Sequence, residues 1–466
     1  MSNQGSPKRV SFPYAMFVLI VTLILPIVAG AVFNLSLIAL FCIAWIPAFA
    51  LCLRCGFSYE KLESGMYALI AKSLLALVFM IVIGGMSGAW NNSGTIATVT
   101  YYGLQIFSPK FYSLTAFIIC LIFSLATGTS WGTCGTIGVS LVGVGLGLGL
   151  DPVAAALPIF TAAFVGDMCS PLSDTPNIIA AATGVKVMDH CRYQLRIVVP
   201  GVVILCAMYV VNGITSSGTS VSVEEVTALR EAIASTYHIG IIPILPLVIV
   251  VIMLIKKLPT VPTILIGMVS AMFVACLYQG VSISDCVTAV WSGNVLTSEN
   301  ELLNTLFSRG GMTSAFEIIM LGFAAFGLFG ILQTAGIFDA ALEPIVKRAK
   351  SEMAINLVAM GVAIVLTLGG IVSISIITTG ELMGKYYKEK GYNIYNLAMV
   401  LSVCSMMFCT VMPWHANAII PARNLGCELG DLTPHMYLPW IFLAILIVTI
   451  FIGTRKKKAK EEVIAS

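Results

Sequence analysis

The chain has 466 residues, of which 58% are hydrophobic and 10% charged, and its formal net charge at pH 7 is +3. Soluble proteins carry about 25% charged residues, so a soluble chain of this length would expose large apolar patches. This excludes a water-soluble enzyme, and the small net charge excludes a nucleic-acid-binding protein. We predict an all-α polytopic membrane protein, because the apolar stretches are continuous and do not alternate as in a membrane β-barrel.

Eight apolar stretches are long enough to cross a bilayer, which takes about twenty residues. They cover residues 11–33, 36–53, 66–88, 194–213, 239–255, 260–280, 312–335 and 436–453. Four more are interrupted by clusters of Gly, Ser, Thr and Pro, at residues 112–149, 152–184, 352–384 and 394–427. We predict re-entrant or paired hairpins at 112–149 and 352–384, and broken helices at 152–184 and 394–427.

The distribution of Lys and Arg predicts the orientation, because these residues are enriched in cytoplasmic loops. Both ends of the chain and several loops are basic, whereas the loops around Asp151, Glu224 and Asp285 are acidic. All basic loops fall on one side if the two predicted hairpins enter the membrane and return. We therefore expect a multi-pass protein of a bacterial inner (plasma) membrane with both termini cytoplasmic. Residues 214–238 would form an extracytoplasmic loop, and the basic tail at 454–466 would contact anionic lipid.

Helix-breaking residues recur at a constant shift of 242 positions. The shift relates Gly85, Gly88, Gly94, Gly128, Gly138 and Pro171 to Gly327, Gly330, Gly336, Gly370, Gly380 and Pro413. By the charge argument, the stretch at 66–88 and its counterpart near 308–330 cross in opposite directions. We predict two inverted-topology repeats, residues 1–213 and 239–453, an arrangement typical of secondary transporters whose site lies at the midplane breaks.

The breaks in the first half combine prolines, hydroxyls and acids. Pro171 and Pro176 each remove an amide donor, so we expect the helix to open between them. Opening frees carbonyl oxygens, which suit Na⁺ or Li⁺, and Asp167 and Asp174 supply negative charge. The hydroxyls available as further ligands are those of Ser130, Thr133, Ser170, Ser173 and Thr175. A buried carboxylate has a raised pKa, so it can exchange a proton for a metal ion; the alternative for Asp174 is a helix N-cap.

These residues resemble a known family. The segments Gly128–Gly138 (GTSWGTCGTIG) and Gly166–Thr175 (GDMCSPLSDT) are similar to motifs of the NhaC-type sodium/proton antiporters, within the ion transporter superfamily. Asn91–Thr98 (NNSGTIAT), ahead of Tyr101-Tyr102-Gly103, and Pro413-Trp414 fit the same family, and the resemblance covers residues 66 to 430. It implies cation-coupled antiport, with members that exchange Na⁺ for H⁺ and others that exchange organic acids such as malate and lactate.

The chain departs from the family pattern at two positions. Met168 stands where the family commonly has Lys after the Gly-Asp pair, and His415 stands where it commonly has Asn after Pro-Trp. His415 and Arg423 suggest an organic substrate, because an Arg side chain forms two hydrogen bonds to a carboxylate. Asn417 and Asn177 are further candidates for this site. The alternatives are a packing role for His415 and a structural ion pair, or an outward-reaching side chain, for Arg423.

We therefore predict a secondary active transporter that is not an enzyme. Na⁺ and H⁺ would compete for Asp167 and Asp174 by alternating access, with no cofactor other than these coupling ions. The second hypothesis is an Na⁺- or H⁺-coupled exchanger of a small organic anion or amino acid, and the third is a channel. A homodimer is one possible assembly.

Overall fold

The structure, a computed structural model, describes residues 10–33, 35–215, 223–298, 301–308, 310–349, 351–368, 372–412 and 414–465. Every regular element in these ranges is a helix. Nine of these helices are long and apolar enough to cross a membrane, or ten if one bent pair near the C-terminus counts as a span. The prediction of an all-α polytopic membrane protein is confirmed.

The first half of the chain forms helices at the predicted stretches. Their bounds are α1 Phe12–Leu19, η1 Ile20–Ile24, α2 Leu25–Phe33, α3 Leu37–Arg54, α4 Tyr59–Asn92, α5 Thr95–Ile106, η2 Pro109–Phe111, α6 Tyr112–Thr127, α7 Ser130–Thr133, η3 Cys134–Gly138, α8 Val139–Gly147, α9 Pro152–Cys169, α10 Asp174–Thr183, α11 Val187–Thr215 and α12 Val223–Thr236. Of these, η1 and η3 are π-helical turns inside longer helices, where the backbone hydrogen bonds skip one residue more than usual.

The second half is also built of helices, some of them π- or 3₁₀-helical. Its bounds are η4 Ile242–Ile244, α13 Leu245–Ile255, α14 Thr260–Leu277, α15 Ile283–Ser292, α16 Glu301–Phe307, η5 Met312–Ala315, α17 Phe316–Thr334, α18 Ile337–Arg348, α19 Glu352–Thr367, α20 Val372–Glu389, α21 Ile394–Leu401, η6 Ser402–Met407, η7 Phe408–Val411, α22 Ala416–Asn424, α23 Leu429–Leu432, η8 Thr433–His435 and α24 Leu438–Ala465. The π-helix η6 and the 3₁₀-helix η7 continue α21 up to the second predicted break.

Some elements differ from the sequence prediction. The stretch at 239–255 forms a helix over Ile242–Ile255, too short to count as a span. At 1.5 Å per residue this helix is about 21 Å long, less than the roughly 30 Å hydrocarbon core. The sequence analysis missed α5, α12, α15, α16 and α18, which are short or polar and carry too few consecutive apolar residues. The predicted loop at 214–238 therefore contains a helix, α12, and its residues 216–222 lie outside the described ranges.

Both predicted helix breaks are present. α9 ends at Cys169 and α10 begins at Asp174, and the two parts together form an apolar span, Pro152–Thr183. Pro171 lies in the break, but Pro176 lies in the first turn of α10, where proline needs no amide partner. The helix is therefore open over residues 170–173 and closed again before Pro176. In the second half the break follows Val411, and its Pro413 lies outside the described residues.

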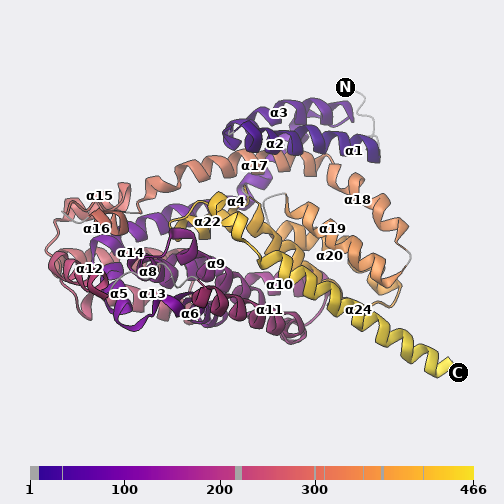
Figure 1. Ribbon diagram of the computed structural model, residues 1–466. Helices are drawn as coiled ribbons and strands as arrows, with labels where there is room; N and C mark the ends of the chain where they lie inside the picture. The colour runs from indigo at the N-terminus through magenta and orange to yellow at the C-terminus, as the bar shows by residue number, and fades with distance from the viewer. Residues whose placement is uncertain are drawn as a thin grey trace.

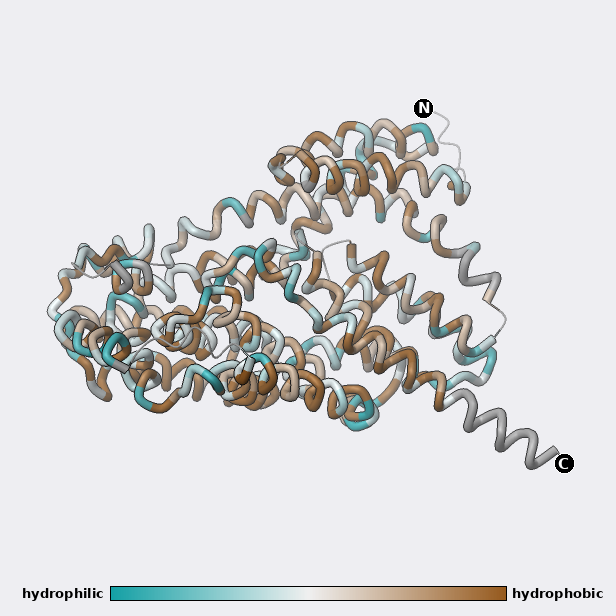
Figure 2. The backbone as a smooth tube through the Cα atoms, viewed as in Figure 1, coloured by the Kyte–Doolittle hydropathy of each residue, from teal (hydrophilic) through white to brown (hydrophobic). Residues whose placement is uncertain are grey.

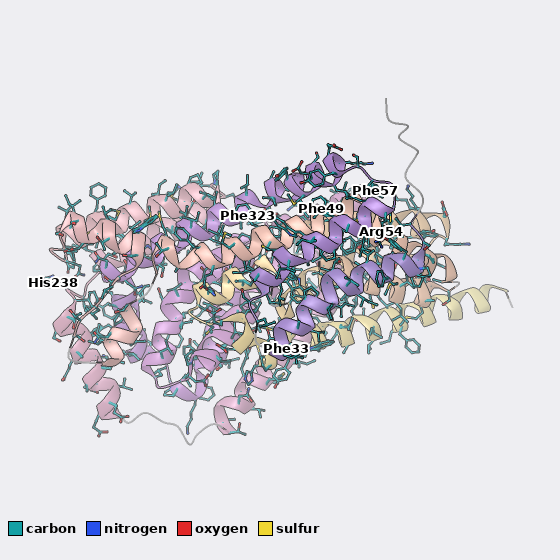
Figure 3. The ribbon with its side chains drawn as sticks, turned by 90° about the horizontal axis from the view of Figure 1, so that it is seen from above. Phe33, Phe49, Arg54, Phe57, His238 and Phe323 are labelled. Carbon is teal, nitrogen blue, oxygen red and sulfur yellow. The ribbon has the colours of Figure 1, made fainter. Side chains whose placement is uncertain are left out.

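α1–α3, α17 and α18 run together along the upper side of the molecule in Figure 1, where α17 packs on α3 and α18 on α1. The start of α1 and the end of α24 lie at the right-hand end, whereas α12, α15 and α16 lie at the left. Figure 2 shows long hydrophobic stretches on α1–α3 and on the first part of α24. In Figure 3, Arg54 lies toward one end of the molecule and His238 at the opposite end. Arg54, a basic residue, and the C-terminal end of α24 thus lie toward the same end of the molecule.

Helix boundaries follow the 242-residue shift. It converts residues 95–106 of α5 into 337–348, the bounds of α18, and residues 130–147 into 372–389, the bounds of α20. It also converts α9 into residues 394–411, the extent of α21 with η6 and η7, and the start of α10 into the start of α22. The inverted orientation of the repeats and the limits 1–213 and 239–453 stay predictions.

Contacts cross between the halves. α10, after the first break, packs on α20, while α22, after the second break, packs on α7 and η3. Each broken helix therefore packs on helices of the segment predicted as a hairpin in the other half, so the segments after the two breaks contact opposite halves of the chain.

Candidate functional site

A buried carboxylate lies at the first helix break. Asp167, near the end of α9, is 7% exposed, and its Oδ2 accepts a 2.9 Å hydrogen bond from the backbone N–H of Ser130. The hydroxyls of Ser130 and Ser173 face the same carboxylate. Among the carboxylates whose exposure the structure describes, Asp167 alone is buried. One negative charge, two hydroxyls and a helix N-terminus therefore converge at this point.

The local sequence turns Ser130 toward this carboxylate. Gly128 ends α6 in the left-handed conformation, with φ of 70°, and the hydroxyl of Thr129 accepts a hydrogen bond from the backbone N–H of Gly132. The chain thus reverses within two residues and starts a new helix. Because α6 and α7 both pack on α9, the first amide of α7 points at Asp167.

The break itself is stabilised by serine side chains. Ser170 Oγ donates to the carbonyl of Leu125 at 2.8 Å and accepts from the N–H of Leu172 at 3.2 Å. Ser173 is the N-cap of α10, and its Oγ accepts from the N–H of Thr175 at 3.1 Å. Ser170 thus connects the break to α6, and Ser173 closes the new helix end beside Asp167.

Other predicted cation ligands lie away from the carboxylate or are engaged elsewhere. The Thr133 hydroxyl donates to the carbonyl of Thr129 in its own helix, at 2.7 Å. Asp174 is exposed at the first position of α10, which is capped by Ser173. Asn177, also exposed, donates from Nδ2 to the carbonyls of Pro171 and Ser173 across the break. The structure therefore unites Asp167, Ser130 and Ser173, whereas Asp174 is exposed and acts on Asp167 only through its charge.

The second break places a histidine where the first has a serine. His415, the N-cap of α22, is fully buried, and its Nδ1 accepts from the N–H of Asn417 at 3.2 Å. Its Nε2 has no hydrogen-bond partner in the described structure. The 242-residue shift relates His415 to Ser173 and Cys409 to Asp167. Cys409 lies close enough to Asp167 for the carboxylate charge to act on it. Of these two matched positions, the one before the first break is an acid and the one before the second break is a thiol.

Arg423 is paired with acids. Its guanidinium lies 3.0 Å from Glu428 and 3.7 Å from Glu317, and its Nε donates to Glu428. Arg423 is eight residues after His415 on α22, which is about 12 Å along a helix axis. The contacts of Arg423 therefore match the structural ion pair that was the alternative for this residue. The side chains of Arg423 and His415 do not converge on one small group of a substrate.

A cavity of about 570 Å³ lies between α4, η3, η5 and α22. Its wall includes Gly135, Arg423 and Asn424. Asn424 Nδ2 is buried and has no hydrogen-bond partner among the described residues. Gly135 lies five residues beyond Ser130, so the cavity approaches Asp167 within about one and a half helical turns. The sequence analysis missed Asn424 and Cys409, although the repeat shift alone relates Cys409 to Asp167.

Comparison with known proteins gives consistent matches. A sequence model described as the Na⁺/H⁺ antiporter family matches residues 7–214 and 163–455. An uncharacterised Na⁺/H⁺ antiporter of Haemophilus influenzae is 32% identical, over 94% of this chain and 96% of its own. A malate-2H⁺/Na⁺-lactate antiporter of Bacillus subtilis is 29% identical over 89% of each chain. The Na⁺/H⁺ antiporter NhaC of Alkalihalophilus pseudofirmus is also 29% identical, over 90% of each chain.

Proposed function

Because the chain belongs to the Na⁺/H⁺ antiporter family, we propose that Na⁺ and H⁺ compete for the carboxylate of Asp167 and that this competition couples their transport. The observation that carries the proposal is the burial of this carboxylate at the break, against the N–H of Ser130. Ser130 and Ser173 supply further oxygens for a bound Na⁺. The exposed Asp174 attracts cations toward the break without holding them.

The coupling follows from the cost of a bare charge in the membrane. An ionised carboxylate in apolar surroundings is unfavourable unless it is paired or protonated. The transporter therefore reorients readily with a proton or with Na⁺ on Asp167, and poorly with neither. One carboxylate binds one of the two cations at a time. Transport of one cation across the membrane therefore requires the other cation to cross in the opposite direction.

Transport by carboxyl variants in proteoliposomes tests this mechanism. Asp167→Asn removes the charge, so we expect Na⁺-driven H⁺ flux to fall to the background of empty liposomes. Asp174→Asn is the matched control and is expected to keep at least about half of the flux, because an exposed charge contributes little. Size-exclusion chromatography verifies that both variants are folded. Full flux in a folded Asp167→Asn variant would contradict the assignment.

The cavity supports a second candidate, exchange of a small organic anion together with the cations. Its volume of about 570 Å³ far exceeds that of a sodium ion, and it contains the buried, unpartnered amide of Asn424. Arg423 lies at its wall and would have to exchange its acidic partners for a substrate carboxylate. A panel of carboxylates and amino acids, screened by thermal stabilisation, tests this: a hit that persists in Asn424→Ala and Arg423→Ala would exclude binding in this cavity.

The bacterial inner membrane and a cytoplasmic location of both termini are part of the same proposal. It is supported by the basic loops and by the position of the first and last helices at one end of the molecule. The extracytoplasmic end would then hold α12, α15 and α16.

A further inference from the structure

A cluster of hydroxyls lies beside the second break, in the half where no carboxylate of described exposure is buried. Thr367 ends α19, Ser375 lies in the first turn of α20, and Ser405 lies in the π-helix η6. All three side chains are fully buried. We call Thr367, Ser375 and Ser405 the hydroxyl cluster.

Five oxygens meet in the hydroxyl cluster. Ser375 Oγ is 2.8 Å from Ser405 Oγ, and Thr367 Oγ1 is 3.0 Å from Ser375 Oγ. The backbone carbonyl of Ala363 accepts from both Thr367 and Ser375, and the carbonyl of Cys404 lies 3.4 Å from Thr367 Oγ1. Hard monovalent cations bind to such sets of hydroxyl and carbonyl oxygens, and transporters obtain them where helices are irregular. The π-helix provides this irregularity.

A fourth hydroxyl on the same helix face lacks a partner. Thr379 is one turn after Ser375 on α20 and fully buried, and its Oγ1 has no hydrogen-bond partner among the described residues. A hydroxyl in a membrane interior ordinarily donates to a carbonyl of its own helix, so an unpartnered one is unfavourable. The hydroxyl cluster therefore has unused hydrogen-bonding capacity at its edge.

The other half does not repeat the hydroxyl cluster. The 242-residue shift relates Thr367, Ser375 and Ser405 to Leu125, Thr133 and Ala163. In the first half, two of these three positions are apolar, so helix packing alone does not require hydroxyls there. At the positions related by this shift, the first half thus has the acid without the cluster, and the second half has the cluster with Cys409 in place of the acid.

The segment that contains Ser405 also comes near the carboxylate of Asp167. Cys409 is one turn beyond Ser405 in the same segment, and the Asp167 charge acts on its thiol. A negative charge near this segment favours a cation bound to its oxygens.

We propose that the hydroxyl cluster is a second binding site for a monovalent cation, Na⁺ or Li⁺, formed by neutral hydroxyl and carbonyl oxygens. The site rests on the proposed exchange at Asp167 and gives the transported ion a second position in the core. It takes one ion in turn with the first site, because a single buried carboxylate balances one positive charge.

Na⁺ dependence of H⁺ flux in proteoliposomes tests the site. Ser375→Ala and Ser405→Ala each remove one ligand, so we expect the KM for Na⁺ to rise about tenfold, equivalent to about 1.4 kcal/mol, with a maximal rate near wild type. Ser405→Thr keeps the hydroxyl and restores the KM. Ser73→Ala is the matched control, because Ser73 is buried and its hydroxyl donates to the carbonyl of Leu69 within α4.

A binding measurement without transport complements the kinetics. Trp414 Nε1 donates to the carbonyl of Leu368, the residue after Thr367, at 3.0 Å. Titration with NaCl, with choline chloride as the ionic-strength control, is expected to change tryptophan fluorescence, and the change is lost in Trp414→Phe. In Ser405→Ala the half-saturating Na⁺ concentration rises by the same factor as the KM.

The outcomes separate this site from the proposed function. If folded Ser375→Ala and Ser405→Ala proteins keep the wild-type KM and titration midpoint, the hydroxyl cluster is a packing feature and the inference is wrong. If wild-type protein shows no Na⁺-driven H⁺ flux but the NaCl titration responds, the exchange proposal fails while the cation site stands.

Discussion

Asp167 and Asp174 are seven residues apart in one motif but occupy different environments. The sequence predicted both as cation ligands, because each lies beside a proline-containing break. In the structure Asp167 ends up inside the bundle, while Asp174 starts a new helix on the exposed side. The difference arises because α6 and α7 pack on α9 before the break, whereas Asp174, at the first position of α10, is left exposed.

Gly128 allows a test of the geometry around Asp167. A Cβ at this position would lie 2.7 Å from backbone atoms of Leu172 and Ser173, and the residue has φ of +70°. Gly128→Ala should therefore shift the break and reduce Na⁺-driven H⁺ flux by roughly tenfold or more, because overpacking in a core costs 1–3 kcal/mol. Flux and melting temperature in detergent measure the effect.

Gly184 supplies the matched control for Gly128. It has a similar φ, +79°, but a Cβ there would meet no atom within 4 Å. Gly184→Ala bears only the backbone strain of about 1–2 kcal/mol and should keep most of the flux at a slightly lower melting temperature. Equal loss of flux in both variants would show that strain, and not the contact with the break, causes the effect.

At the scale of elements, the 242-residue shift that relates glycines and prolines in the sequence also relates the bounds of complete helices. α5 and α18 coincide under the 242-residue shift, although neither was predicted. Both follow a long helix and a glycine in the left-handed region, Gly94 and Gly336. The repeat was visible in the sequence because helix ends depend on local residues, whereas short helices lack the long apolar stretch by which spans are found.

The pair α14 and α15 provides a test of packing and sidedness together. Cys276 Sγ and Cys286 Sγ are 3.4 Å apart, so a small side-chain rotation brings them to the roughly 2.05 Å of a disulfide. A mild oxidant that accepts two electrons, as the thiols release two protons, is expected to join Cys276 to Cys286. Peptide mapping by mass spectrometry without reductant detects the bond.

Controls for this cross-link come from the chain itself. Cys276→Ser abolishes the bond, and Cys206, partly exposed on α11, stays a free thiol. A membrane-impermeant maleimide applied outside intact cells before the oxidant is expected to block the bond, because we propose that α15 is extracytoplasmic. Protection only after the cells are opened would reverse the proposed orientation.

At the scale of the whole molecule, Asp167 is the one described carboxylate inside the bundle. Its counterpart under the repeat shift is Cys409, a thiol and not a second acid. One carboxylate balances one monovalent cation, so we expect one H⁺ to be exchanged for one Na⁺ without net charge movement.

The equilibrium of opposing gradients measures this ratio. In proteoliposomes a tenfold Na⁺ gradient should be balanced by a gradient of about one pH unit, since both correspond to about 1.4 kcal/mol. A membrane potential set with K⁺ and valinomycin should leave the balance point unchanged, also in Asp174→Asn. A balance point that moves with the potential would mean that a second charge crosses with each cycle.

The sequence by itself determined the class, most of the spans, the helix breaks and the repeat. These depend on hydropathy over about twenty residues and on Gly and Pro, whose effects are local. Only the tertiary structure decided which acid is buried, that Arg423 is bound by Glu428, and that Thr367, Ser375 and Ser405 meet. These contacts join helices that are distant in sequence, and burial depends on what packs against each helix. Charge is too scarce for a soluble protein, and among the carboxylates whose exposure the structure describes, Asp167 alone is buried in the core.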